Sequence, residues 1–309
     1  MRKIKGDASF RLFFRKIKSK KSSIIVYAKK EKKKNLLIYD AINRILIKNN
    51  VLAPQLFSQN FEKNFIEIED FGDLTILKLL KKKGKYSSSI FKKIIDTLIK
   101  IQLIKEKKIK NFKNKKYFIP YYTNKVLIDE ALLFSDWYAN KKLSKQNYLH
   151  FKNKYKKIIQ NLTKRLNFRN NIFVHRDFHV SNLMLIRNKI AVIDSQDALI
   201  GNRAYDLASL IDDVRYKTSS KFKDKLFDMY ISRQKKLNIK KFKNDFEILS
   251  VLRNLKIIGI FTRLAFRDNK KKYLKLIPYA WTLIKLRTNN NKYFKELNAL
   301  LLKTFNKKN

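Results

Sequence analysis

The chain has 309 residues, of which 73 are Lys or Arg and 25 are Asp or Glu, giving a formal net charge of +48. Its 45% hydrophobic and 13% aromatic content is too apolar for a disordered polycation, and its length suits one large domain or two lobes. The absence of cysteine excludes disulfides, thiolate nucleophiles and cysteine-based zinc sites.

The sequence gives no sign of a membrane segment. No apolar run reaches the roughly 18 residues that suggest a span, and the first seven residues lack the apolar core of a signal peptide. We therefore expect a cytoplasmic protein without membrane insertion.

The positive charge is spread along the whole chain. The lysines rarely alternate with aromatic residues in a base-stacking pattern, and Lys, Asn and Ile are abundant while Gly and Pro are scarce, as an A/T-rich coding sequence would produce. This profile favours compositional drift over a dedicated nucleic-acid surface, so we expect no dedicated nucleic-acid partner. The field still attracts anionic nucleotides and phosphosugars.

The first 73 residues predict a small β-rich lobe. Short hydrophobic segments bounded by polar turns predict strands. Apolar residues at helical spacing predict one helix, Leu36–Ile47. Phe71-Gly72-Asp73 then interrupts the pattern. The predicted strands are Phe10–Ile17, Ile24–Ala28 and Phe65–Asp70.

From Leu74 onward the pattern is mostly helical, with two short strand signals at Asn171–His175 and Leu183–Ile193. The sequence thus predicts an α+β fold of two lobes, residues 1–73 and 74–309, with a cleft between them. The predicted helices are Leu74–Lys83, Ser87–Lys105, Tyr122–Ala139, Gln146–Leu166, Arg203–Arg215, Lys221–Gln234, Lys241–Phe266 and Tyr273–Arg287.

One motif dominates the second part of the chain. Residues 175–182 spell H-R-D-x-x-x-x-N, and Asp194 follows twelve residues after Asn182, at the end of an apolar run. Protein kinases carry a catalytic-loop Asp and Asn, then a magnesium-binding Asp, in this order. Residues 175–215 also hold six Asp against five Lys or Arg, in a chain that is otherwise strongly basic.

The residue types suit phosphoryl transfer. That reaction needs a carboxylate to orient and accept the proton of the attacking hydroxyl, which Asp177 provides. It also needs oxygen ligands for Mg²⁺, and the Asn182 amide and the Asp194 carboxylate are of that kind. The pattern predicts a site that uses ATP and Mg²⁺.

Several segments together resemble the aminoglycoside-phosphotransferase and choline-kinase superfamily, which has a protein-kinase-like fold. They are similar to its branch of bacterial kinases that phosphorylate the anomeric hydroxyl of N-acetylmuramate and N-acetylglucosamine. The matching stretches run from near residue 6 to near residue 280. They are Gly6–Arg11, Glu69–Asp73, His175–His179, Asp194–Gly201, Tyr205–Leu210 and Leu255–Asp268.

The resemblance implies roles for several residues. Asp177 would lie beside the sugar hydroxyl and take or orient its proton. Asp206, after Tyr205, would be a structural carboxylate that supports the catalytic loop through charge-assisted hydrogen bonds. Gln196 and Asp197 lie near the implied sugar site, where they either contact substrate or stabilise a turn.

The two motif histidines are read differently. His175 is expected to hold the loop in shape rather than to react. His179 either reaches a phosphate or packs in the core, and the sequence leaves both open. A zinc site is not expected, because no Cys is available and the kinase pattern already explains the motif.

The nucleotide-binding part carries a weaker signal. Ser9 and neighbouring backbone N–H groups could cradle phosphates, and Glu69 and Phe71 would belong to an inter-lobe hinge whose backbone meets adenine. The strand lysine of a kinase V-A-I-K pattern has no clean equivalent here. Arg11 and Lys29 are the candidates for the cation that grips the phosphates.

The function expected from this resemblance is ATP-dependent phosphorylation of an amino sugar to its 1-phosphate, with a small sugar as the partner. One alternative is a kinase of another small alcohol, such as choline, an aminoglycoside or a different sugar. Another is a catalytically degenerate, basic nucleic-acid-binding protein. The sequence leaves the oligomeric state and the exact sugar undetermined.

Overall fold

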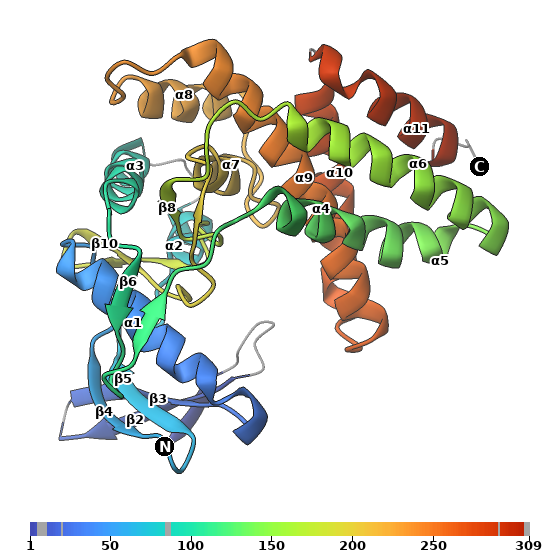
Figure 1. The fold of residues 1–309 in the computed structure, drawn as a ribbon. Coiled ribbons are helices and arrows are strands. Elements are labelled where there is room, and N and C mark those ends of the chain that lie inside the picture. Colours follow the sequence, from blue (N-terminus) through green and yellow to red (C-terminus); the bar gives the residue numbers. More distant parts are fainter. Residues whose placement is uncertain (5–10, 20, 84–87, 290, 306–309) are drawn as a thin grey trace. The chain divides into compact units, whose positions relative to one another are not determined.

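A computed structural model describes residues 1–4, 11–19, 21–83, 88–289 and 291–305 (Figure 1). It has the predicted α+β composition, with an antiparallel sheet near the N-terminus and a mainly helical remainder. The chain forms two compact units. The first unit contains Met1–Tyr121 and Ile172–Ile200, and the second contains Tyr122–Asn171 and Gly201–Asn309. The predicted division into a nucleotide-binding lobe of residues 1–73 and a second lobe of residues 74–309 stays a prediction.

The first unit begins with a five-stranded antiparallel sheet in the order β1-β2-β3-β5-β4. Alternate residues of the central strands are buried, as the period of two requires. Lys18 pairs with Lys21, so the first hairpin extends further into polar residues than its hydrophobic pattern indicated. The strands are β1 (Arg2–Ile4), β2 (Leu12–Lys18), β3 (Lys21–Tyr27), β4 (Leu56–Asn60) and β5 (Phe65–Glu69).

Helix α1 (Lys34–Lys48) packs against this sheet (Figure 1). Its Leu36 and Tyr39 side chains are buried in one cluster with residues of β3 and β5, including Val26 and Ile66. This burial fixes which face of α1 meets the sheet, because residues three and four apart share one side of a helix.

The described remainder of the first unit includes the 3₁₀ turn Lys30–Lys32, two further helices and several short paired strands, of which β11 reaches one residue into the second unit. Helix α2 contacts β9, and α3 contacts β8 and β10. The helices are α2 (Ile76–Lys83) and α3 (Ser88–Gln102), and the paired strands are β6 (Lys108–Lys110) with β7 (Lys116–Phe118), β8 (Ile172–Val174) with β11 (Leu199–Gly201), and β9 (Leu183–Ile186) with β10 (Lys189–Val192).

The second unit is helical. Several of its helices begin at a side chain that accepts a hydrogen bond from a backbone N–H of the first turn, namely Thr123, Ser144, Ser219 and Asn238. The α-helices are α4 (Asn124–Leu133), α5 (Asn140–Lys142), α6 (Lys145–Lys164), α7 (Tyr205–Ile211), α8 (Ser220–Ile231), α9 (Ile239–Phe266), α10 (Ile277–Thr288) and α11 (Lys295–Phe305), with a π-helix at Phe134–Ala139 and 3₁₀ turns at Lys271–Leu276 and Lys292–Phe294.

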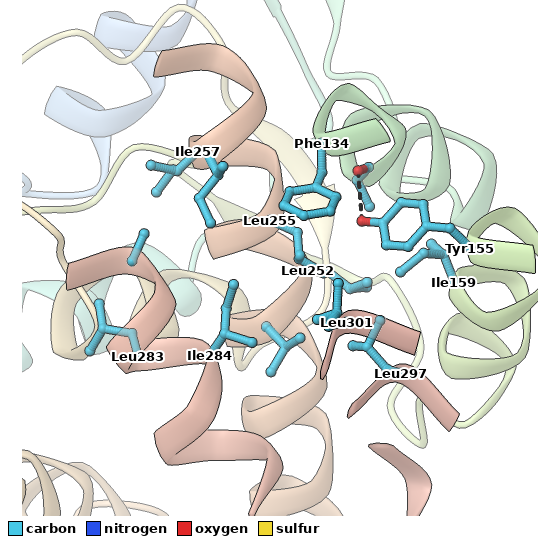
Figure 2. Close-up of a cluster of buried hydrophobic side chains, with 14 of the residues drawn as sticks. Phe134, Tyr155, Ile159, Leu252, Leu255, Ile257, Leu283, Ile284, Leu297 and Leu301 are labelled. Atoms are coloured by element: carbon cyan, nitrogen blue, oxygen red, sulfur yellow. Dashed lines mark hydrogen bonds between the residues drawn. The ribbon is translucent and has the colours of Figure 1, made fainter. Parts of the chain in front are cut away.

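The core of this unit is built around α9. Figure 2 shows Leu252, Leu255 and Ile257 of α9 with apolar side chains of α10 and α11 and with Phe134. The hydroxyl of the fully buried Tyr155 donates a hydrogen bond of 3.0 Å to the Ala131 carbonyl, which satisfies the polar end of this ring.

Most predicted elements are confirmed with shifted ends, but three predictions need correction. Tyr122–Ala139 is not one helix, because α4 is followed by a π-helix. Leu183–Ile193 is a hairpin, in which Arg187 and Asn188 turn the chain with positive φ. Tyr273–Arg287 begins as a 3₁₀ turn before α10. Each helix in the described part of the chain is too short or too polar to cross a lipid bilayer.

Candidate functional site

The H-R-D-x-x-x-x-N segment forms a tight loop after β8. The Asp177 carbonyl accepts hydrogen bonds from the His179 backbone N–H at 3.0 Å and from the Asn182 side-chain Nδ2 at 3.1 Å. Arg176 has a φ of 75°, a conformation that costs a non-glycine residue energy and is typical of functional loops. The loop is therefore held in one shape around the partly exposed Asp177.

The β9–β10 hairpin brings Asn182 and Asp194 to the same end. Leu183 pairs with Val192, so the residues just outside the hairpin lie side by side. The Asn182 carbonyl accepts a hydrogen bond of 3.0 Å from the N–H of Ile193, which directly precedes Asp194. The geometry thus joins the amide and the second carboxylate of the motif through the backbone.

Asp194 has a φ of 64°, in the left-handed region, so its backbone leaves the strand direction directly after β10. Its side chain is 42% exposed, and its Oδ1 accepts a hydrogen bond of 2.6 Å from Nη2 of Arg11. This ion pair joins two residues that are 183 positions apart in the sequence.

Arg11 is held on several sides. Its side chain is 3% exposed, and the guanidinium donates a second hydrogen bond, 2.8 Å long, from Nη1 to Oε1 of Gln196. The Cζ atom lies 5.5 Å from the ring centroids of both Phe13 and Tyr39, within cation–π range. Two acceptors and two aromatic rings therefore fix the orientation of this cation.

A second connection ties α1 to the acidic segment. Oγ of Ser195 donates a hydrogen bond of 2.6 Å to Oδ1 of Asn43, whose Nδ2 donates to the Pro54 carbonyl at 3.1 Å.

Burial raises the pKa of Tyr39 to about 12, despite the nearby cation of Arg11, so its hydroxyl stays protonated at neutral pH.

His175 is completely buried. Burial lowers the pKa of His175, against the opposing effect of Asp177 and Asp194 and of a backbone hydrogen bond with Ile193. A neutral, buried imidazole is consistent with the loop-shaping role expected from the sequence. His179 is also buried, with 3% of the residue exposed. This burial favours packing in the core over contact with a phosphate.

Gln196 and Asp197 differ in accessibility. Gln196 is 7% exposed, and while its Oε1 receives Arg11, its Nε2 donates to Oδ2 of Asp197 at 2.8 Å. The Asp197 side chain is 49% exposed, and its Oδ1 lies 3.8 Å from Nη1 of Arg176. Of the two, Asp197 is the one that an incoming molecule can reach.

The segment after β5 carries an ion-pair cluster centred on Arg15. This side chain is 11% exposed and donates to Asp70 at 2.5 and 2.9 Å and to Asp73 at 2.6 Å. Burial alone would raise the pKa of Asp70, but Arg15 and the Gly72 N–H outweigh it and lower that pKa. The pKa of Arg15 is raised by both carboxylates. The cluster fixes the chain around Glu69 and Phe71.

The remaining predicted residues are distributed as follows. Ser9 lies outside the described residues. Lys29 is exposed at the start of a 3₁₀ turn. Asp206 is buried in the first turn of α7, in the second unit, whereas the catalytic loop belongs to the first.

The oxygen donors of Asn182 and Asp194 fit a magnesium ion. Mg²⁺ prefers oxygen and is bound through one or two carboxylates together with substrate phosphates and water. The Asn182 Nδ2 is engaged with the Asp177 carbonyl, which leaves its amide oxygen as the group of the correct chemistry. In the described part of the chain, no three His, Cys, Asp or Glu side chains form an all-protein metal cluster.

The sequence patterns missed Arg15, Tyr39 and Asn43. The partners of Arg15, Asp70 and Asp73, lie 55 and 58 residues away, so no local pattern indicated this cluster. The roles of Tyr39 and Asn43, four residues apart on the buried face of α1, depend on long-range packing that local patterns do not contain.

Comparisons with known proteins show the family to which the chain belongs. The model of the phosphotransferase enzyme family matches residues 1–237.

Several relatives are similar over most of the chain, and two of them, both called N-acetylmuramate/N-acetylglucosamine kinase, serve as examples. The protein from Neisseria meningitidis serogroup B is 29% identical, over 88% of this chain and 81% of its own length. The protein from Pseudomonas aeruginosa is 27% identical, over 96% of this chain and 86% of its own length.

Solved structures support the fold. The structure of the gentamicin–APH(2")-IIa complex matches with a TM-score of 0.64 and 13% identity, over 92% of both chains. The ethanolamine kinase of Plasmodium vivax matches with a TM-score of 0.62 and 15% identity, over 91% of this chain and 80% of that one. The predicted kinase-like fold is therefore confirmed.

Proposed function

Because this chain belongs to the phosphotransferase enzyme family, we propose that it transfers the terminal phosphoryl group of ATP to the anomeric hydroxyl of N-acetylmuramate or N-acetylglucosamine. The product is the sugar 1-phosphate. The acceptor is taken from the curated relatives, which align with 88% and 96% of the chain. The cytoplasmic location stays a prediction.

The observation that carries the proposed reaction is the hydrogen bond between the Asn182 carbonyl and the Ile193 N–H. It brings one amide and one carboxylate to the same end of a hairpin, while the Asn182 side chain holds the backbone of Asp177. Positioning supplies most of the catalysis in phosphoryl transfer, so a fixed loop is what this chemistry requires.

Each residue has a proposed role. Asp177 accepts or orients the proton of the sugar hydroxyl, since its side chain is partly exposed on the fixed loop. Asn182 and Asp194 would hold Mg²⁺, and the bound ion would supply neutralisation of phosphate charge. Asp197, exposed beside Arg176, contacts the acceptor, while the buried Gln196 supports the site through Arg11.

The supporting residues complete the proposal. His175, buried and neutral, fills the space under the loop. Asp206 supports the catalytic loop, as the family resemblance implies. Glu69 and Phe71 belong to the segment fixed by Arg15, where backbone groups meet adenine.

A substrate panel tests the proposed function. The protein is incubated with ATP, Mg²⁺ and one acceptor at a time, including both amino sugars, glucose, choline and kanamycin, and products are followed by phosphorus NMR. A 1-phosphate from an amino sugar is expected. Turnover of only choline, kanamycin or another hydroxyl compound would show that the proposed acceptor is wrong and that the proposed phosphoryl transfer is correct. RNA binding without any turnover would favour the basic nucleic-acid-binding alternative.

The Asp177→Asn variant tests the assigned base. Loss of a proton acceptor is expected to lower kcat by about 10² to 10⁴-fold, with an unchanged circular dichroism spectrum. Asp129→Asn is the control, because Asp129 is an exposed carboxylate on α4. If Asp177→Asn retained the turnover of the control, Asp177 would not be the base.

A further inference from the structure

The chain has no clean equivalent of the strand lysine that kinases pair with a helix glutamate. Helix α1 carries a single carboxylate, Asp40, and this group is bonded to Arg44 at 2.8 Å within the same helix. Lys29, one of two candidate cations, is exposed. Neither half of a lysine–glutamate pair is therefore present in its usual form.

Arg11 contacts the segment that contains the proposed metal ligand Asp194. Among the described residues of the first unit, it is the cation that bonds the proposed magnesium ligand Asp194, at 2.6 Å. The neighbouring cations of β2 are engaged elsewhere, since Arg15 binds Asp70 and Lys16 binds Glu67.

The surroundings of Arg11 are those of a fixed group. An arginine that is 4% exposed loses its hydration and is stable only when its donors meet acceptors. Here two different nitrogens meet two different residues, Asp194 and Gln196. The rings of Phe13 and Tyr39 lie at equal distances of 5.5 Å from the cation and hold its plane. A flexible surface ion pair would show none of these features.

Helix α1 takes part through neutral groups. Tyr39 contacts Arg11, and Asn43, one turn later, accepts the hydrogen bond of Ser195. The helix is thus linked to the segment Asp194–Gln196 directly through Ser195 and indirectly through Arg11, in both cases by neutral side chains of α1.

We propose that Arg11 is a positioning residue that holds Asp194 in its metal-binding orientation and, with Tyr39 and Asn43 of α1, replaces the kinase lysine–glutamate pair. This inference rests on the proposed function, because it assumes that Asp194 binds Mg²⁺ with a nucleotide. The ion pair is made through the carboxylate oxygen Oδ1 of Asp194. Removing a partner that orients a metal ligand typically costs 10- to 100-fold in metal affinity.

The experiment measures Mg²⁺-dependent ADP binding, without any sugar acceptor. ADP binding is followed by calorimetry at increasing MgCl₂ for the wild type, Arg11→Met and Arg11→Lys. In Arg11→Met, the Mg²⁺ concentration for half-maximal binding is expected to rise by about 10-fold or more. Arg11→Lys is expected to lie between, since an ammonium is a point charge and lacks the planar fork that meets two acceptors at once.

Arg44→Met is the matched control. Arg44 also pairs with an aspartate of the first unit, but its partner is Asp40, which is not a proposed metal ligand. It is expected to stay within about twofold of the wild type. In an Asp194→Asn background, Arg11→Met should change the Mg²⁺ concentration for half-maximal ADP binding by less than about twofold. The reason is that the effects of two residues that act through one another are not additive.

The outcomes separate the two proposals. Absence of Mg²⁺-dependent ADP binding by the wild type would remove both the proposed function and this inference. Normal binding by the wild type together with an unchanged Mg²⁺ requirement in Arg11→Met would overturn the inference alone. If Arg11→Met does not fold, Arg11→Lys decides, and a wild-type Mg²⁺ requirement in that variant would reject the positioning role.

Discussion

Individual residues carry two kinds of constraint in this molecule. At Arg176 and Asp194, non-glycine residues hold positive φ angles of 75° and 64°, next to the proposed base and at the proposed metal ligand. Such conformations cost energy that the surrounding contacts must offset. At Gly259 the constraint is steric instead, because the backbone of another helix lies against it.

The Gly259→Ala substitution is expected to be strongly destabilising. A Cβ atom at this position would lie 2.3 Å from the Leu133 carbonyl carbon and oxygen and 2.6 Å from the Phe134 nitrogen, and backbone atoms cannot move aside. We expect a loss of about 3 kcal/mol or more in the free energy of unfolding, the upper part of the range for overpacking. Urea denaturation followed by circular dichroism measures it.

Gly72→Ala provides the comparison. Gly72 has a φ of 79° but nothing within 4 Å of an added Cβ, so only the conformational cost of about 1 to 2 kcal/mol applies. Equal stability losses in the two variants would contradict the steric explanation for Gly259.

Sequence patterns predicted the residues of the site better than their contacts. The roles of Asp177, Asn182 and Asp194 stay predictions, and the hairpin places the backbones of Asn182 and Asp194 at one end. Which of Arg11 and Lys29 grips the phosphates also stays a prediction. The partners of Arg11 lie 183 and 185 residues away, at Asp194 and Gln196, and no local period contains such a contact.

Helices and strands meet at a few polar junctions. Asp212, at the end of α7, is fully buried and binds Lys223 of α8, Ser250 of α9 and Arg287 of α10. Burial would raise the pKa of Asp212, but Arg287 and Lys223 outweigh it, so that pKa is lowered. One carboxylate thus joins four helices.

The Asp212→Asn variant is expected to lose about 3 to 5 kcal/mol at pH 7, because two buried cations would lose their counter-charge. The lowered pKa in the folded state means that the carboxylate stabilises the protein fully above about pH 4, where an exposed aspartate is ionised. This contribution is lost as the pH falls through the lowered folded-state pKa. The difference in unfolding free energy between wild type and variant should therefore shrink in acid.

Asp228→Asn is the control for this series, since Asp228 is an exposed carboxylate on α8. Denaturation at several pH values from 7 downward provides the comparison. A stability difference between wild type and Asp212→Asn that stayed constant down to the acid-unfolding range would argue against the ionised network.

Elements were predictable where a single period continued. The long helix Ile239–Phe266 and the strand Phe65–Glu69 follow from such periods. The π-helix Phe134–Ala139 was not foreseen, because its apolar spacing also fits an α-helix and the difference lies in backbone hydrogen bonding. The short strands Lys108–Lys110 and Lys116–Phe118 carry too few residues for any pattern to be read.

The whole molecule carries a net charge of +48, and this charge has a cost for folding. With 73 basic and 25 acidic residues, the folded state concentrates like charges that the unfolded chain can separate. Short ion pairs such as Arg15–Asp70 relieve the repulsion only locally.

Added salt is therefore expected to stabilise the protein. Raising NaCl from about 20 to 300 mM shortens the screening length from over 20 Å to below 10 Å, and the midpoint of thermal unfolding should rise by several degrees. Sucrose at equal osmolarity is the uncharged control. A midpoint that fell or stayed constant with NaCl would mean that specific ion pairs outweigh the general repulsion.

The order of folding follows from the way the first compact unit is divided along the chain. Residues 172–200 belong with residues 1–121, although fifty residues of the other unit are made between them. A growing polypeptide on the ribosome thus exposes the N-terminal sheet and α1 long before Asp194 and Gln196 have been synthesised. Arg11 must wait for its first acceptor until 183 further residues have been synthesised, so the nascent chain passes through a long interval in which a cation destined for burial remains in water.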